Sequence, residues 1–131
     1  MLKHRKGTPM RYMYLVKSNM QEMPPERLFT EMNKLAQKAI ASGAMIDNGG
    51  LLPPHMGGAT ISLQGGKITV TDMPMAESKE VIGGYAIFEF KTREEALQSA
   101  LDFMNLHKEF GEGWEGVCEM RPMGGNLRDP V

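Results

Sequence analysis

Two short runs of the chain are apolar at consecutive positions, and this feature most constrains the fold. Residues 11–17 and residues 85–90 are both rich in aromatic and β-branched side chains, which is typical of strands. In the first run, Tyr12 and Tyr14 point to one face, whereas Met13 and Leu15 point to the other. Because both faces of this strand are apolar, we expect both to be buried against other protein surfaces.

Two other segments repeat their apolar residues at helical spacing. The first opens at Pro24-Pro25-Glu26, where prolines suit the first turn, and closes at Ser42-Gly43. The second opens at Thr92, which forms a capping box with Glu95. The apolar positions are Leu28, Phe29, Met32, Leu35, Ala36, Ala39, Ile40, Ala96, Leu97, Ala100, Leu101 and Met104. Each predicted helix therefore has one face to pack on a sheet.

A hairpin and two further strands complete the pattern. Residues 59–64 and 67–72 alternate apolar and polar side chains around Gly65-Gly66, which predicts a hairpin with a two-residue turn. Strands are also expected at residues 44–50 and 114–121.

The order β-α-β, hairpin, β-α-β predicts an α+β, ferredoxin-like split βαβ fold with an inserted β-hairpin and both helices on one face of the sheet. The opposite face is apolar too, and such a patch is unusually large for a monomer. We therefore expect a homodimer that buries this face. Residues 10–123 form the predicted domain, with a flexible basic tail at 1–9 and a flexible tail at 124–131.

Composition excludes several classes of protein. With 131 residues and a net charge of −1, the chain has no excess of positive charge with which to bind the phosphates of a nucleic acid. Its one cysteine, Cys118, permits no intramolecular disulfide and no zinc site of several thiolates. Neither a membrane-spanning apolar run nor a secretory signal is found. We expect a cytoplasmic protein that binds neither nucleic acid nor membrane.

No cofactor or metal is expected. Residues 111–116 match the letters G-x-G-x-x-G, but they follow a predicted helix and open a strand, the reverse of a dinucleotide fingerprint. The three histidines, His4, His55 and His107, lie in different predicted elements.

The loop after the hairpin is the densest group of ionisable residues in an otherwise apolar stretch. A carboxylate near Lys79 and buried aromatic residues can act as an acid or base, so Asp72 and Glu77 are the candidate catalytic residues. Tyr14, Lys79 and Arg121 are the candidate ligand-binding residues. The spacing alone favours the alternative, in which Asp72 caps a turn and the other charges are solvated.

The chain from Met10 to Met123 resembles the YCII-related family, and within it the DGPF-domain branch. The segments that carry the resemblance cover nearly the whole domain in order: residues 11–16, 49–51, 65–67, 70–72, 76–80, 81–85 and 119–122. The resemblance implies a dimeric α/β barrel of ferredoxin-like protomers.

This chain departs from the family pattern at two places. The signature Asp-Gly-Pro-Phe stands here as Asp72-Met73-Pro74-Met75, and the first predicted helix lacks the histidine of the family's recurring His and Asp. Three functions stay open: a small-molecule-binding, acid/base-catalytic dimer, a non-catalytic regulatory or protein-interaction module, and an assembly subunit without a pocket. The resemblance implies the regulatory role, because similar proteins are often encoded beside extracytoplasmic-function sigma factors.

Overall fold

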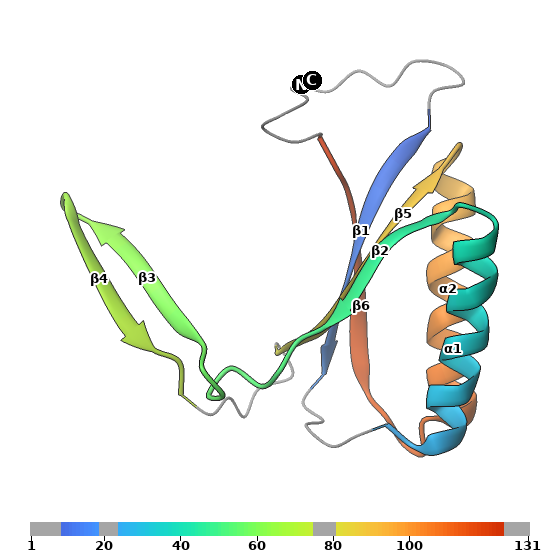
Figure 1. The fold of residues 1–131 in the computed structure, drawn as a ribbon, viewed down its shortest axis with the longest axis horizontal. Helices are drawn as coiled ribbons and strands as arrows, with labels where there is room; N and C mark the ends of the chain where they lie inside the picture. The colour runs from blue at the N-terminus through green and yellow to red at the C-terminus, as the bar shows by residue number, and fades with distance from the viewer. Residues whose placement is uncertain (1–8, 19–23, 75–80, 125–131) are drawn as a thin grey trace.

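A four-stranded antiparallel sheet forms the body of the computed structural model, which describes residues 9–18, 24–74 and 81–124. Its strands lie in the order β2–β5–β1–β6. Their bounds are β1 (Met10–Ser18), β2 (Met45–Gly50), β5 (Ile82–Phe90) and β6 (Gly116–Pro122). Helices α1 (Glu26–Ala41) and α2 (Arg93–Phe110) both cover one face of this sheet (Figure 1). The predicted α+β, ferredoxin-like fold is therefore confirmed.

The core lies between the sheet and the helices. Tyr12 and Tyr14 of β1 are buried beside Phe88 of β5, and the rings of Tyr14 and Phe88 lie 4.9 Å apart. The buried residues of α2 that face them are small, Ala96 and Ala100, so the helix backbone approaches the rings closely. The phenol of Tyr14 donates a hydrogen bond to the carbonyl of Ala96 and so ties the sheet to α2.

Both helices begin where the sequence predicts. At the start of α2, the backbone N–H of Glu95 donates to the Thr92 hydroxyl at 3.1 Å, which satisfies one of the free donors of the first turn. Helix α1 begins directly after Pro25 and buries Leu28 completely.

The last strand begins later than predicted. The expected strand at residues 114–121 is replaced by β6 from Gly116, because Glu112 and Gly113 both have positive φ and turn the chain. Trp114 lies in this turn and packs on His107, with ring centroids 4.4 Å apart. Burial lowers the pKa of His107, and its Nδ1 lies 3.0 Å from the carbonyl oxygen of Phe103. This histidine joins the end of α2 to the turn.

Strand β5 is longer than predicted, since residues 82–84 pair with β1 and β2. A side-chain pattern read from the sequence misses them because two of these residues are glycines.

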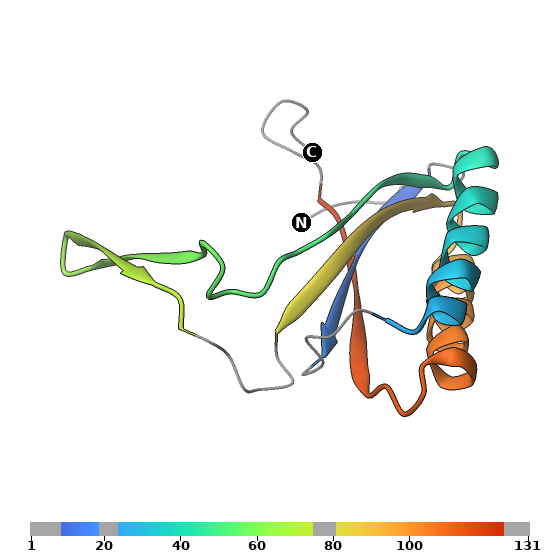
Figure 2. The same cartoon turned by 60° about the horizontal axis from the view of Figure 1, so that its bottom comes forward.

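The hairpin forms as predicted from β3 (Ala59–Gln64) and β4 (Lys67–Asp72). Gly65 and Gly66 have φ of 55° and 77°, the left-handed values that a tight two-residue hairpin turn requires. The hairpin is a separate two-stranded sheet and extends away from the body, on the side opposite the helices (Figures 1 and 2).

Most of the two predicted tails falls outside the described residues, so the flexibility of residues 1–9 and 124–131 stays a prediction. Among the helices that the structure describes, none is long and apolar enough to cross a bilayer.

Tyr14 is expected to ionise only near pH 12, because burial raises the pKa of its phenol to about 12. The folded-state pKa lies above the usual value, so the stabilisation by the neutral phenol is complete below about pH 10 and is lost as the pH rises toward 12. In an ultraviolet titration of tyrosinate, the Tyr14→Phe variant should lack the step near pH 12, whereas Tyr85→Phe should retain it. A step near pH 12 that persists unchanged in Tyr14→Phe would contradict the assignment.

Candidate functional site

The sheet face that points away from the helices has an apolar centre. The register places Met13 opposite Ile87 and Leu15 opposite Tyr85. Because neighbouring residues of a strand alternate between faces, these four side chains lie on the face opposite the buried Tyr14. All four are only half-buried. We call this surface the open face.

Charged residues surround the apolar centre of the open face. The Arg11 Nε lies 3.5 Å from Glu89 Oε2, and the Lys17 Nζ lies 2.9 Å from Glu119 Oε2. The hydrogen bond from Lys17 lowers the pKa of Glu119 below its usual value. Ion pairs at a surface add little stability, but the pair with Lys17 keeps the Glu119 carboxylate charged at neutral pH. The open face is therefore apolar in the middle and ionic around it.

Tyr85 and Asp47 form the main polar contact at the β2 side of the open face. The phenol of Tyr85 donates to Asp47 Oδ2 at 3.2 Å, and the backbone N–H of Asn48 donates to Asp47 Oδ1 at 2.8 Å. The acceptor carboxylate raises the pKa of Tyr85, so the phenol stays protonated. A Cβ on Gly49 would lie 2.7 Å from Cε1 of Tyr85, so only glycine leaves room for the ring. The hydroxyl is thus held in a fixed direction.

The structure separates two of the predicted ligand-binding residues. Arg121 is exposed on β6 and pairs with Met13, which places it on the open face. Tyr14 lies on the other face, in the core, with only 4% of its surface exposed. Arg121 can therefore contact a ligand on the open face, whereas Tyr14 lies on the other side of the sheet.

The predicted catalytic residues lie at the base of the hairpin or beyond it. Asp72 is exposed at the end of β4, where it pairs with Ala59. The next residue, Met73, donates its backbone N–H to the carbonyl of Gly58 at 3.0 Å. Glu77 and Lys79 lie outside the described residues. The end of β4 lies away from β1 and β6 in both views, so neither Tyr14 nor Arg121 adjoins Asp72 (Figures 1 and 2).

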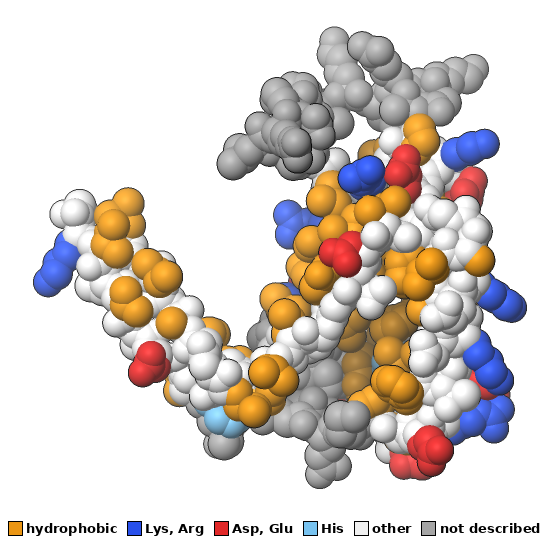
Figure 3. Space-filling model, viewed as in Figure 1, with side chains coloured by type: hydrophobic (Ala, Val, Ile, Leu, Met, Phe, Trp, Pro, Cys, Tyr) orange, Lys and Arg blue, Asp and Glu red, His pale blue; other side chains and the backbone are white. Residues whose placement is uncertain are grey.

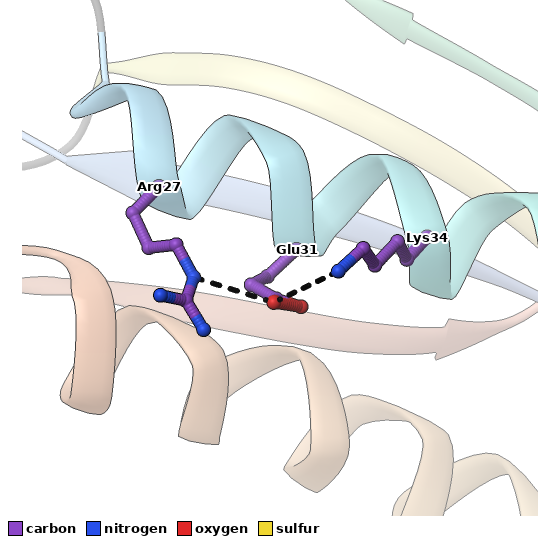
Figure 4. Close-up of polar contacts among 3 residues, drawn as sticks. All are labelled: Arg27, Glu31 and Lys34. Carbon is purple, nitrogen blue, oxygen red and sulfur yellow. Dashed lines mark hydrogen bonds and ion pairs between the residues drawn. The ribbon is translucent and has the colours of Figure 1, made fainter.

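A groove of about 850 Å³ runs between the two helices, on the outer side of the helix layer. The sequence suggests only solvated charges here, but the Glu31 side chain is 16% exposed and lies 3.4 Å from both Arg27 Nε and Lys34 Nζ (Figure 4). Phe29 also lines the groove and is 54% exposed. The groove therefore presents an aromatic ring beside fixed charges.

Sequence reasoning missed the contact between Tyr85 and Asp47. A signal was present, because glycines inside strands often mark a close approach of another group, and Gly49 is such a residue. Strand pairing was needed to show that the group is the ring of Tyr85. Among the described residues, no three histidine, cysteine, aspartate or glutamate side chains come together as a metal site.

Comparison with known proteins identifies the family. The model of the YCII-related domain matches residues 10–105, which include both helices except the end of α2, and all strands except β6. No curated protein matches the chain. The matched region spans well over half of the 131 residues. The chain therefore belongs to the YCII-related family.

Proposed function

We propose that this YCII-related protein is a homodimer that binds a small organic anion at the open face. The observation that carries the proposal is the apolar centre of this face, formed by Met13, Leu15, Tyr85 and Ile87, with the guanidinium of Arg121 beside it. The second copy closes over the site, which gives the dimeric α/β barrel that the family resemblance implies. A ligand with an apolar body would contact the centre, and its anionic group would bind Arg121.

A second copy of the chain is the partner that fits the open face best. A half-buried apolar patch on a central sheet is typical of surfaces that associate. In a two-fold dimer the same patch serves both copies, so an apolar centre meets an apolar centre. The charges around the centre, such as Lys17 with Glu119, are already paired within one copy and stay at the wet edge of the interface.

The role of the loop after β4 stays a prediction. Asp72 is exposed, so an acid/base reaction there needs groups that come from residues 75–80 or from the second copy. Assignment to the DGPF-domain branch is likewise a proposal, supported by the acid and proline retained at Asp72 and Pro74. A cytoplasmic location is proposed with it.

Replacing Ile87 by aspartate should break the dimer. An unpaired carboxylate in an apolar interface costs several kcal/mol, so the dissociation constant should rise at least about a hundredfold. Sedimentation velocity measures it, and far-UV circular dichroism checks the fold. The matched control is Ile40→Asp on α1, where the side chain is 49% exposed. A wild-type protein that stays a folded monomer at micromolar concentration would contradict the homodimer.

Removing the charge of Arg121 should weaken anion binding. The probe is 1-anilinonaphthalene-8-sulfonate, an aromatic anion that fluoresces in apolar sites. Loss of a charge-assisted hydrogen bond should raise its dissociation constant about tenfold in Arg121→Gln. Arg93→Gln, an exposed arginine at the start of α2, is the control. Equal binding by the two variants would exclude Arg121 as the anion site.

A second candidate function, a non-catalytic protein-interaction module, is favoured by the groove between the helices. An exposed phenylalanine, Phe29, beside the paired charges of Glu31 suits a partner that inserts an amphipathic helix. The family resemblance suggests an extracytoplasmic-function sigma factor from the same genome as that partner.

Replacing Phe29 by serine tests this second candidate. If the groove holds the partner helix, calorimetric titration with the purified sigma factor should show binding about tenfold weaker than wild type. Leu97→Ser is the matched control, since Leu97 is 40% exposed on α2 and does not line the groove. Wild-type affinity in Phe29→Ser would remove the groove from the interaction.

A further inference from the structure

The hairpin has one largely aliphatic face, with Ala59 and Asp72 at its base, that nothing in the described chain covers. Its register pairs Ile61 with Val70 and Leu63 with Ile68, so the four aliphatic side chains share one face. Each of them is between 67% and 71% exposed. The opposite face is polar throughout: Thr60, Ser62, Gln64, Lys67, Thr69 and Thr71. This alternation is that of a hairpin with one side buried and the other in water.

A two-stranded hairpin alone is marginally stable in water, so this one needs a surface to pack on. The aliphatic face does not pack on the four-stranded sheet of the same chain, because the hairpin extends away from the body (Figures 1 and 2). Its base is fixed by hydrogen bonds, from Met73 N–H to the Gly58 carbonyl and from Gly58 N–H to the Pro54 carbonyl, both at 3.0 Å. The turn glycines hold the register and so keep the aliphatic face intact.

The aliphatic face continues the apolar surface of the sheet. The segment between β2 and β3 carries Leu51, Leu52 and Met56, which are 49%, 71% and 56% exposed. Figure 3 shows hydrophobic side chains on the hairpin, on this segment and on the flank of the sheet that faces the hairpin. The hairpin and the open face therefore border the same space, on the side opposite the helices.

We infer that the β3–β4 hairpin is an arm that packs its aliphatic face on the second copy of the chain. The inference rests on the proposed homodimer and names the surface that completes it. A copy placed on the open face occupies the space beside the arm, and the two-fold relation gives each copy one arm from the other. A membrane is a poorer occupant, because Lys67 is the arm's one cation and Asp72 offsets it, whereas membrane-binding surfaces carry several basic residues.

The test compares the two faces of the arm in the full-length protein. Leu63→Ser with Ile68→Ser removes two aliphatic residues, and Ser62→Ala with Thr69→Ala changes the adjacent pair on the polar face. Loss of two buried anchors should raise the dimer dissociation constant about tenfold or more, whereas the polar-face variant should stay near wild type. Sedimentation equilibrium measures both, and circular dichroism checks that the body stays folded.

Photocrosslinking at a protein concentration that saturates the dimer gives a second readout, which reports contact between the copies. A benzoylphenylalanine at position 63 should yield a covalent dimer on irradiation, and one at position 69 should yield much less. The two proposals can fail separately. Suppose that the wild type dimerises and Ile87→Asp does not, while the aliphatic-face variant dimerises normally and position 63 gives no crosslink. The inference about the arm is then wrong, and the homodimer stands. The same result is expected if the arm binds a membrane or another protein. A monomeric wild type would overturn both proposals.

Discussion

The antiparallel pairing of β1 with β5 is the constraint on which the rest of the structure depends. Its register decides at once which side chains enter the core and which lie on the open face. With Tyr14 opposite Ala86 and Met13 opposite Ile87, the two tyrosine rings of β1 point to the helices, whereas Met13 and Ile87 point away from them. A slip of one residue would exchange the two faces. The alanines of α2 then fit against the rings, and the Tyr14 hydroxyl fixes the contact at Ala96.

The same pairing creates the candidate site. Because the helices use one face of the sheet completely, an apolar centre and its charged surround remain on the other. The site is therefore built on strands, where neighbouring side chains are held rigidly. Three of its polar groups come from different strands: Asp47 from β2, Tyr85 from β5 and Arg121 from β6. Ligand binding and self-association would share this one surface. The two proposals are linked for that reason, since the second copy would exclude water from the bound anion and strengthen its contact with Arg121.

The hairpin, like the open face of the sheet, has apolar side chains that the described part of its own chain leaves uncovered. Its strands have the alternation of a half-buried element, yet the body of their own chain leaves the aliphatic face exposed. An isolated hairpin with such a face gains stability only if another surface covers its aliphatic side chains. An arm from each copy would add contacts far from the two-fold axis, and these contacts resist rotation of one copy against the other. The dimer would then hold the open faces in one relative orientation, as a ligand site between them requires.

Local signals in the sequence determined most of the elements. The hairpin and its register followed from the Gly65-Gly66 turn, and the start of α2 followed from the Thr92 hydroxyl, because both depend on residues adjacent in the chain. The start of β6 was wrong by two residues, since the aromatic Trp114 has strand character but packs on His107 across a turn. No local pattern shows that contact.

The sequence alone also determined that both faces of β1 are apolar, and hence that a single layer of helices leaves one of them exposed. Only the tertiary structure decided which candidate residues share a surface. It put Arg121 beside Met13 on the open face and Tyr14 in the core, although both were expected to line one pocket. It also brought Asp47 to Tyr85, which is far from it in the chain. The reason is physical: the side of a sheet on which a residue lies depends on strand register, and register is set by pairing between distant segments.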